Sequence, residues 1–422
     1  MRFEVSRVMD TVEQRLTTDI TLAQAVVDLA DVARFQELDG GRPVNLLRVG
    51  MVLDALAQYL LDGAAMLFPI AGRELISDQS LTSKERMVLG RWVDSGRIEA
   101  VPMVGDRVIE VADFSGMPVI ARRSYRQYAD RFPWLTSSPE RVLRLDRRPG
   151  KAVLTPDAGS DSSPASAGSS PSKATGAPRS VGRYAAERTV TPEKGERVFQ
   201  PRARQAETRV STRAIEPAAE PSSLGATLLA RSWRCGEDLC PSFGPDREIG
   251  EPVPRLLKGV PSCPRHERPL TDNGSRPAEY PVAVVIEDAV RLRFPVTAAA
   301  PVHVGRDADI SLKLWLHESS SSWIADRHLR LDIIDGGLVV TGAGENGTVV
   351  WHRTAPGDAP QSVRLYEGQR YALGRHDTIE LYTGVELVPG NRRVVGGPVS
   401  ARDVLSVLAD APTVALRAHS SS

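Results

Sequence analysis

The sequence has few cysteines, no dominant charge and no long apolar run. Three cysteines in 422 residues are too few for a disulfide framework, and their odd number favours a reducing compartment. Lysine plus arginine and aspartate plus glutamate both number 53, so no global field attracts the chain to nucleic acid or anionic membranes. No apolar stretch reaches the roughly 20 residues that span a bilayer. We therefore expect a cytoplasmic protein with no membrane partner and no secretory signal.

The three cysteines share one short segment with a histidine. Cys235 and Cys240 form one close pair, and Cys263 forms a second pair with His266. Three thiolates and an imidazole suit tetrahedral Zn²⁺, and four protein ligands leave no open position for a substrate. The pattern predicts a Cys3His knuckle with structural zinc over residues 223–275, where prolines and glycines leave little else to build a core. The alternative is three reduced thiols beside a surface histidine.

Residues 137–222 have almost no aromatic or periodic apolar content and are rich in Ser, Pro, Ala, Gly and Arg. Such a segment cannot offset its ordering entropy by burial, so we expect a disordered linker. Its later arginines and threonines offer contacts to RNA or sites of phosphorylation. Residues 393–422 are expected to form a polar tail with one short helix at residues 399–409.

In residues 1–136, helical periodicity alternates with short apolar runs, which is the pattern of an α/β domain with a parallel sheet. A helix is predicted over residues 46–61, and Thr82 with Glu85 forms the capping box of a second helix that ends near Gly96. Strands are predicted at residues 33–38, 65–69 and 98–101. Residues 8–16 and 22–32 are predicted to form a helical preface.

The acidic residues of this domain resemble the pattern of PIN or NYN-type ribonucleases. Asp39 matches the acid after the first predicted strand and Asp106 the acid at the start of a later helix, whereas Arg122 and Arg123 occupy a turn where the family has an acid. The resemblance implies a three-layer fold with a Mg²⁺ or Mn²⁺ site, whose ion would activate water and neutralise phosphate charge.

A cation in that turn opposes metal binding, so the domain is expected to be a degenerate one without activity. In that case Asp39 and Asp106 are a turn residue and a helix N-terminal residue. A working metal-dependent ribonuclease with Asp39 and Asp106 as ligands is the alternative.

Half-buried strands are predicted by apolar alternation over residues 276–392, which indicates a β-sandwich. The loops between these strands carry three polar groups: Gly305 with Arg306, Arg327 with His328, and Asn346 with Gly347 and Thr348. A guanidinium can grip phosphate with two hydrogen bonds, and an asparagine beside a glycine can bond a peptide backbone. An edge of this kind binds and does not catalyse.

These loops resemble the recognition edge of forkhead-associated (FHA) domains, which read phosphothreonine. By that resemblance, Arg306 would bind the phosphate, His328 would brace the recognition loop and Asn346 would hold the peptide. The family usually has a Ser-Arg-x-His run, whereas this chain has Ala325 in the serine position, followed by Asp326.

The missing hydroxyl has candidate replacements nearby. Ser321 and Ser322 lie in the segment before Trp323, and Arg327 is a second cation that could turn inward. The alternative is a structural sandwich that binds no phosphate.

The segments together predict a multidomain adaptor that binds a phosphorylated protein or peptide. By the FHA resemblance, the partner is a Ser/Thr kinase or its substrate in a signalling system. Two alternatives stay open: a PIN-type ribonuclease that is targeted by its FHA domain, and RNA binding through the knuckle and the linker, which would be sensitive to salt.

Overall fold

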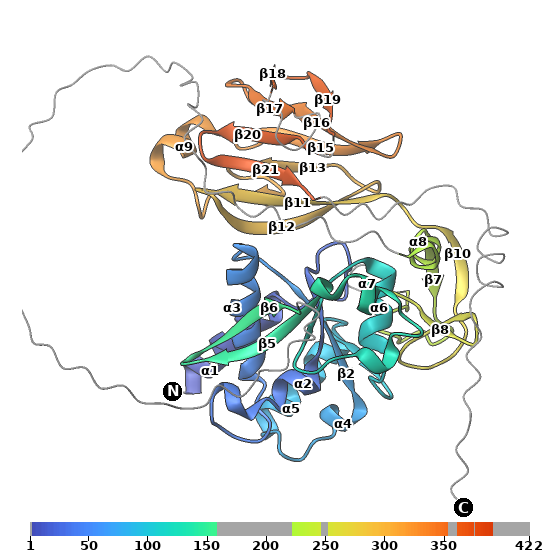
Figure 1. Cartoon of the computed structure of the whole chain (residues 1–422). Helices are drawn as coiled ribbons and strands as arrows, with labels where there is room; N and C mark the ends of the chain where they lie inside the picture. The colour runs from blue at the N-terminus through green and yellow to red at the C-terminus, as the bar shows by residue number, and fades with distance from the viewer. Residues whose placement is uncertain (1, 158–221, 246–251, 353–360, 375, 391–422) are drawn as a thin grey trace, which may run out of the picture. The chain divides into compact units, whose positions relative to one another are not determined.

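The computed structural model describes residues 2–157, 222–245, 252–352, 361–374 and 376–390. Most of the expected linker, from residue 158 to residue 221, and the expected tail helix at residues 399–409 lie outside these residues. Within the described part of the chain, each helix is too short or too polar to cross a membrane. Figure 1 shows an N-terminal α/β region in blue to green and a C-terminal β-sandwich in yellow to red.

The N-terminal domain is built on a 6-stranded sheet with the order β3-β2-β1-β4-β5-β6. Neighbouring strands run parallel from β3 to β5, and β6 returns antiparallel beside β5. The strands are β1 Ala25–Asp28, β2 Leu67–Gly72, β3 Glu99–Val101, β4 Val119–Ala121, β5 Val142–Arg148 and β6 Lys151–Pro156. The chain builds outward from β1 first to one side and then to the other, so β1 and β4 flank a topological switch point.

Helices cover both faces of this sheet. Val27 lies in one hydrophobic core and its neighbour Val26 in the other, as strand alternation requires. The first core packs helices α1 Arg2–Gln14, α2 Leu29–Ala33, α3 Leu47–Leu60 and α5 Ser83–Asp94, and the second packs α6 Arg107–Ser115 and α8 Ser223–Leu229. Shorter helical turns are α4 Arg73–Ile76, α7 Trp134–Ser137 and the 3-10 turns Gln36–Leu38, Arg126–Tyr128 and Pro139–Arg141. The domain therefore has the three layers that were expected.

The ends of helices α3 and α5 agree with the sequence prediction. Helix α3 occupies all but the ends of the predicted range, and Thr82 and Glu85 form the expected capping box at the start of α5. Gly96 follows the last turn of α5 with a φ of +69°, a conformation that glycine adopts without strain.

Two local predictions in this domain are wrong. The predicted strand at residues 33–38 is the end of α2 followed by the 3-10 turn Gln36–Leu38, and the predicted helix at residues 22–32 contains strand β1. All four residues of β1 are buried, so the strand shows no period-two alternation that would reveal it. Asp28 ends the strand and caps α2 by accepting hydrogen bonds from the amides of Ala30 and Asp31.

The expected linker begins later than predicted, because β5 and β6 continue the sheet beyond residue 136. Strand β5 alternates Leu143 and Leu145, which are buried, with Arg144 and Asp146. The arginines of this hairpin make its composition resemble that of the polar segment that follows.

The segment that carries the cysteines packs on the α6 face of the sheet. We call residues 231–275 the zinc module; its strands are β7 Arg231–Arg234, β8 Arg255–Leu257, β9 Val260–Ser262 and β10 Thr271–Ser275. Strand β7 pairs with β10, and β8 pairs with β9. Trp233, Phe243 and Val253 belong to the same buried cluster as Phe68 and Phe114 of the α/β domain. The module is thus part of the domain's third layer rather than a separate knuckle.

The C-terminal sandwich consists of a 6-stranded sheet, β12-β11-β21-β20-β17-β18, and a 5-stranded sheet, β14-β13-β15-β16-β19. Its strands are β11 Glu279–Ile286, β12 Ala289–Thr297, β13 Val302–Gly305, β14 Ile310–Ser311, β15 Leu329–Ile334, β16 Gly337–Gly342, β17 Thr348–His352, β18 Gln361–Leu365, β19 Arg370–Ala372, β20 Thr378–Tyr382 and β21 Val385–Pro389. One core of buried apolar residues from both sheets fills the space between them. Helix α9 Glu318–Trp323 precedes β15.

Gly225 provides a test of the packing between α8 and α6. A Cβ atom at this position would lie 2.4 Å from the backbone of Phe114, so we expect Gly225→Ala to separate the two helices and to cost about 1–3 kcal/mol of unfolding free energy. Gly90→Ala is the matched control, because nothing lies within 4 Å of its Cβ position in α5. That change should stabilise the protein by about 0.5–1 kcal/mol through helix propensity. The free energies of unfolding of both variants can be measured in urea. Equal values for Gly225→Ala and Gly90→Ala would contradict the close approach of α8 to α6.

Candidate functional site

The four predicted zinc ligands converge on one point. The ligand atoms of Cys235, Cys240, Cys263 and His266 all lie within 4.8 Å of one another. The Cys240 and Cys263 Sγ atoms are 3.7 Å apart, and His266 Nδ1 lies 3.5 Å from the Sγ atoms of Cys235 and Cys263. A tetrahedral Zn²⁺ with bonds of about 2.3 Å to sulfur and about 2.0 Å to nitrogen requires S···S near 3.8 Å and S···N near 3.5 Å. The donor set therefore fits zinc in both chemistry and spacing.

Backbone amides prepare this site for thiolates. The amide of Glu237 donates to Cys235 Sγ at 3.5 Å, and the amide of Phe243 donates to Cys240 Sγ at 3.4 Å. A hydrogen bond from the Cys263 thiol lowers the pKa of Cys240 to about 5, whereas burial raises the pKa of Cys235. All three sulfurs belong to buried residues. Four protein ligands would leave no coordination position of zinc open for a substrate, which points to a structural role.

At the edge of the sandwich, Arg306 is held by an acid. Its Nε donates to Asp326 Oδ1 at 2.8 Å, its Nη2 lies 2.7 Å from the same oxygen, and its Nη1 donates to the carbonyl of Ser321 at 2.9 Å. The side chains of Arg306 and Asp326 are 37% and 63% exposed. The guanidinium thus does not stand free at this edge, because the carboxylate of Asp326 neutralises it.

His328 and Asn346 organise the loops around this pair. His328 is fully buried, and its Nδ1 accepts a hydrogen bond from the amide of Ala325 at 3.3 Å. Burial lowers the pKa of His328, which keeps the imidazole neutral. Asn346 is exposed and donates to the carbonyl of Trp323 at 2.7 Å. Both side chains fix the segment between α9 and β15.

The three candidates to replace the hydroxyl missing at Ala325 are in different environments. Ser322 lies in α9, and its hydroxyl donates to the carbonyl of Ser319 at 2.9 Å. Ser321 reaches Arg306 through its backbone carbonyl. Arg327 is exposed and donates no side-chain hydrogen bond to another described residue. Arg327 is thus a second exposed cation in this segment.

In the α/β domain, Asp39 does not belong to a group of acids. Two nitrogens of the buried Arg48 donate to it at 2.8 and 3.0 Å, and Asn45 donates at 2.8 Å. Although burial opposes the shift, these hydrogen bonds and one from the amide of Gly41 lower the pKa of Asp39. Because β1 ends at Asp28, Asp39 also does not follow the first strand. Asp39 instead stabilises a turn by accepting hydrogen bonds from the amide of Gly41 and from Arg48.

Asp106 begins α6, as predicted, but arginines surround it. Arg131 pairs with it directly, and Arg255 of the zinc module lies 3.8 Å away. A Mg²⁺ or Mn²⁺ site needs several oxygen ligands gathered around one point. Among the described residues, the Cys3His cluster is the one group of three or more His, Cys, Asp or Glu side chains close enough to share an ion. The predicted acids therefore do not fit a divalent cation.

Asp28 is the acid that the sequence analysis missed. It ends β1 at the switch point, the place where open α/β sheets usually bind ligands, and burial raises its pKa. Arg123 lies 3.7 Å from Asp28, and Arg122 lies 3.9 Å from Asp31. Two arginines after β4 thus face two acids after β1, and their charges cancel. The signal in the sequence was a short Val-Val run that ends in an aspartate.

Comparisons with known proteins give partial matches only. No family model and no curated protein matches the chain. The MEK1 FHA domain is 18% identical, with 26% of this chain and 88% of that chain covered and a TM-score of 0.20. The FHA domain of human APLF, solved with an XRCC1 bisphospho peptide, is 16% identical over 25% of this chain and 97% of that one, with a TM-score of 0.19.

A third solved structure is the Arabidopsis thaliana nuclear protein-only RNase P 2. It is 17% identical over 32% of this chain and 30% of that chain, with a TM-score of 0.26. Because all three identities and TM-scores are low, we base the functional argument on the residues of this chain.

We expect the purified chain to carry one equivalent of zinc. Cys263→Ser or His266→Gln should remove most of the metal, because each deletes one of four ligands. His303→Gln is the matched control, since His303 pairs with Asp309 in the sandwich. Elemental analysis of metal per chain tests this, and a wild-type chain purified without zinc would contradict the assignment.

Proposed function

We propose that the chain is an adaptor whose sandwich binds a phosphothreonine peptide across the loops that carry Arg306, Arg327 and Asn346. A Ser/Thr kinase or one of its substrates is the partner class that we propose. The observation that supports binding is one loop edge where Arg306 and the exposed Asn346 both bond to carbonyls of α9, braced by the buried His328. In the unbound state, Asp326 accepts the Arg306 hydrogen bonds that the phosphate would accept.

Magnitudes favour displacement of Asp326 by a phosphate. An exposed ion pair such as Arg306 with Asp326 is worth about 0.2–1 kcal/mol, so little free energy is lost when a phosphate displaces the carboxylate. A phosphothreonine carries a charge of about −2 and offers more acceptors than a carboxylate. Asp326 therefore weakens phosphate binding and raises its selectivity for dianions, without closing the site.

Asp326→Asn should strengthen binding of a phosphothreonine peptide by about fivefold, because it removes a competitor worth about 1 kcal/mol. Arg306→Ala should weaken the same binding by tenfold or more. A fluorescence titration with a phosphothreonine peptide library and its dephosphorylated counterpart measures both effects.

Asp335→Asn is the control for the charge change, since Asp335 lies in the turn at the far end of β15. It should leave the affinity unchanged. Binding that ignores dephosphorylation, or that survives Arg306→Ala intact, would defeat the phosphate-reading proposal.

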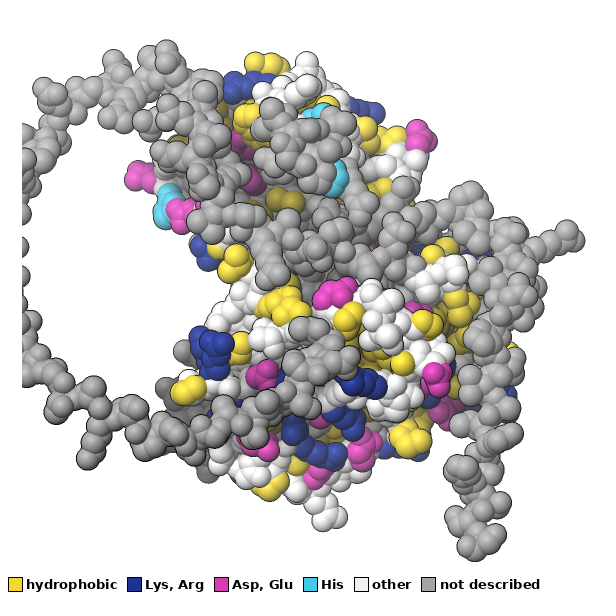
Figure 2. All heavy atoms as spheres, viewed as in Figure 1, with side chains coloured by type: hydrophobic (Ala, Val, Ile, Leu, Met, Phe, Trp, Pro, Cys, Tyr) yellow, Lys and Arg dark blue, Asp and Glu magenta, His cyan; other side chains and the backbone are white. Residues whose placement is uncertain are grey.

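We propose that the α/β domain is PIN-like in fold and serves as a scaffold rather than as a ribonuclease. The pairing of Asp39 with Arg48, of Asp106 with Arg131, and of Asp28 with Arg123 supports this proposal. Figure 2 shows basic and acidic side chains interspersed over the visible face of this domain, whereas an RNA-binding surface usually gathers basic residues. RNA binding through the zinc module or the linker stays an open alternative.

An RNA-cleavage assay with Mg²⁺ or Mn²⁺ tests the scaffold proposal. Wild-type protein should cleave no faster than Asp28→Asn, Asp39→Asn or Asp106→Asn, because in the described part of the chain no group of acids is gathered to hold the ion. The assay should omit chelators, which would remove zinc. Metal-dependent cleavage that disappears in any of these variants would instead establish the ribonuclease alternative.

A further inference from the structure

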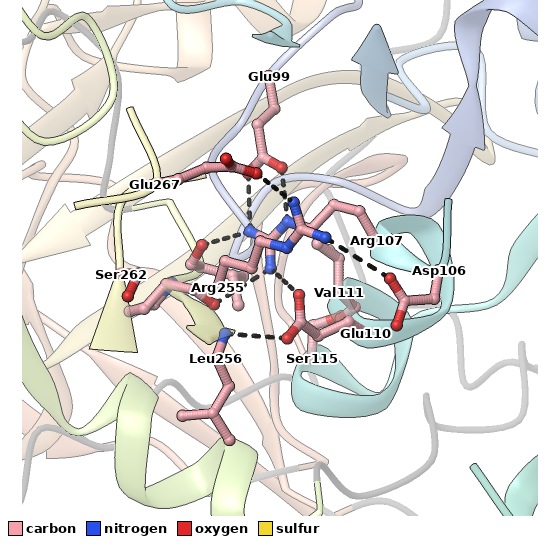
Figure 3. A network of polar contacts seen from close by, with 12 residues as sticks. Glu99, Asp106, Arg107, Glu110, Val111, Ser115, Arg255, Leu256, Ser262 and Glu267 are labelled. Atoms are coloured by element: carbon pink, nitrogen blue, oxygen red, sulfur yellow. Dashed lines mark hydrogen bonds and ion pairs between the residues drawn. The ribbon is translucent and has the colours of Figure 1, made fainter. Parts of the chain in front are cut away.

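Arg107 at the start of α6 is completely buried between two carboxylates. Its Nε lies 2.7 Å and its Nη2 2.9 Å from the oxygens of Glu99, and its Nη1 lies 2.7 Å from Glu110 Oε2. The three side chains are 0%, 1% and 2% exposed. Figure 3 shows the guanidinium at the centre of this network. A buried charge is tolerated only when every one of its polar atoms has a partner.

The α/β domain alone cannot satisfy this guanidinium. Arginine has five N–H donors, and the carboxylates of Glu99 and Glu110 accept three of them. The remaining two bond to the carbonyls of Val253 at 2.5 Å and Pro254 at 3.1 Å, which belong to the zinc module. In return, Glu110 Oε1 accepts the amide of Leu256 at 2.9 Å.

These module residues are joined directly to the zinc ligands. Leu256 lies in β8, which pairs with β9, and Ser262 at the end of β9 immediately precedes Cys263. Arg255 reaches Asp106 of the α/β domain on one side, at 3.8 Å, and Glu267, which follows His266, on the other side at 3.4 Å. The β8–β9 hairpin therefore connects Cys263 and His266, at one end, with Val253 and Pro254, which bond to Arg107, at the other.

Apolar contacts also join the zinc site to α6. Cys240 and Cys263 are members of the buried cluster that includes Phe114 of α6. If the module left α6, this apolar face would be exposed to water. Exposing apolar surface is unfavourable, so undocking is opposed.

We propose that zinc binding by the Cys3His site and docking of residues 253–256 onto α6 are one coupled event, so that loss of zinc releases the module from the α/β domain. The site then acts as a zinc-dependent latch on that domain. Coupling is reciprocal, so contacts on the α6 side must in turn raise the affinity for zinc. This latch does not depend on peptide binding by the sandwich.

The first test is hydrogen exchange on the full chain before and after zinc is removed with a chelator. Removal should accelerate exchange of the amides in α6, outside the module itself, while α3 on the opposite face of the sheet serves as an internal reference. Acceleration confined to residues 231–275 would show a purely local staple and would overturn the proposal.

The second test measures zinc affinity by competition with a chromophoric chelator. Glu110→Gln and Asp106→Asn change the α/β domain and leave every module side chain intact, yet each should weaken zinc binding by about fivefold or more. Asp54→Asn is the matched control, because Asp54 is exposed on α3. Equal affinities in all three variants would contradict the coupling. If Glu110→Gln does not fold, Asp106→Asn carries the test, since Asp106 is partly exposed.

Discussion

The burial of Arg107 is the constraint that organises the N-terminal half of this protein. A guanidinium without solvent requires five acceptors, and no single element of the fold supplies them. Strand β3 contributes Glu99, helix α6 contributes Glu110, and the zinc module contributes two carbonyls. Two neighbouring elements and a segment 147 residues further along the chain must therefore be in place together. Replacing such a network with apolar residues often costs nothing, which suggests that specificity of docking, rather than stability, is what the charges contribute.

The same network explains why Asp106, one of the two predicted acids, is not free. Asp106 and Glu110 begin the helix that faces the module, and arginines from both sides neutralise them. At the switch point, Arg123 performs the equivalent neutralisation of Asp28. At the sandwich edge, Asp326 neutralises Arg306. Asp106, Asp28 and Arg306 thus each belong to an ion pair, and only the exposed pairs can be opened at low cost in free energy.

The sequence predicted features whose cause is local. The periodicity of α3, the capping box of α5 and the clustering of the four zinc ligands were all visible, because each depends on residues close together in the chain or on rare residue types. Features that depend on tertiary partners were not. Strand β1 was missed because burial on both faces removes its alternation, and β5 was missed because its outer face is rich in arginine. The ion pair of Arg306 joins residues 20 positions apart, and composition alone does not reveal it.

The path of the chain through the α/β domain has one last consequence. The main chain leaves the domain after β6, where the amide of Asp157 bonds to Val142, and it re-enters at α8, where the amide of Ser222 bonds to Asp113. Residues 158–221 are thus an insertion with both ends anchored to one body, and not a tether between two bodies. A single proteolytic cut inside the insertion would leave two polypeptides that stay assembled through the shared core, so the nicked protein would still elute as one species.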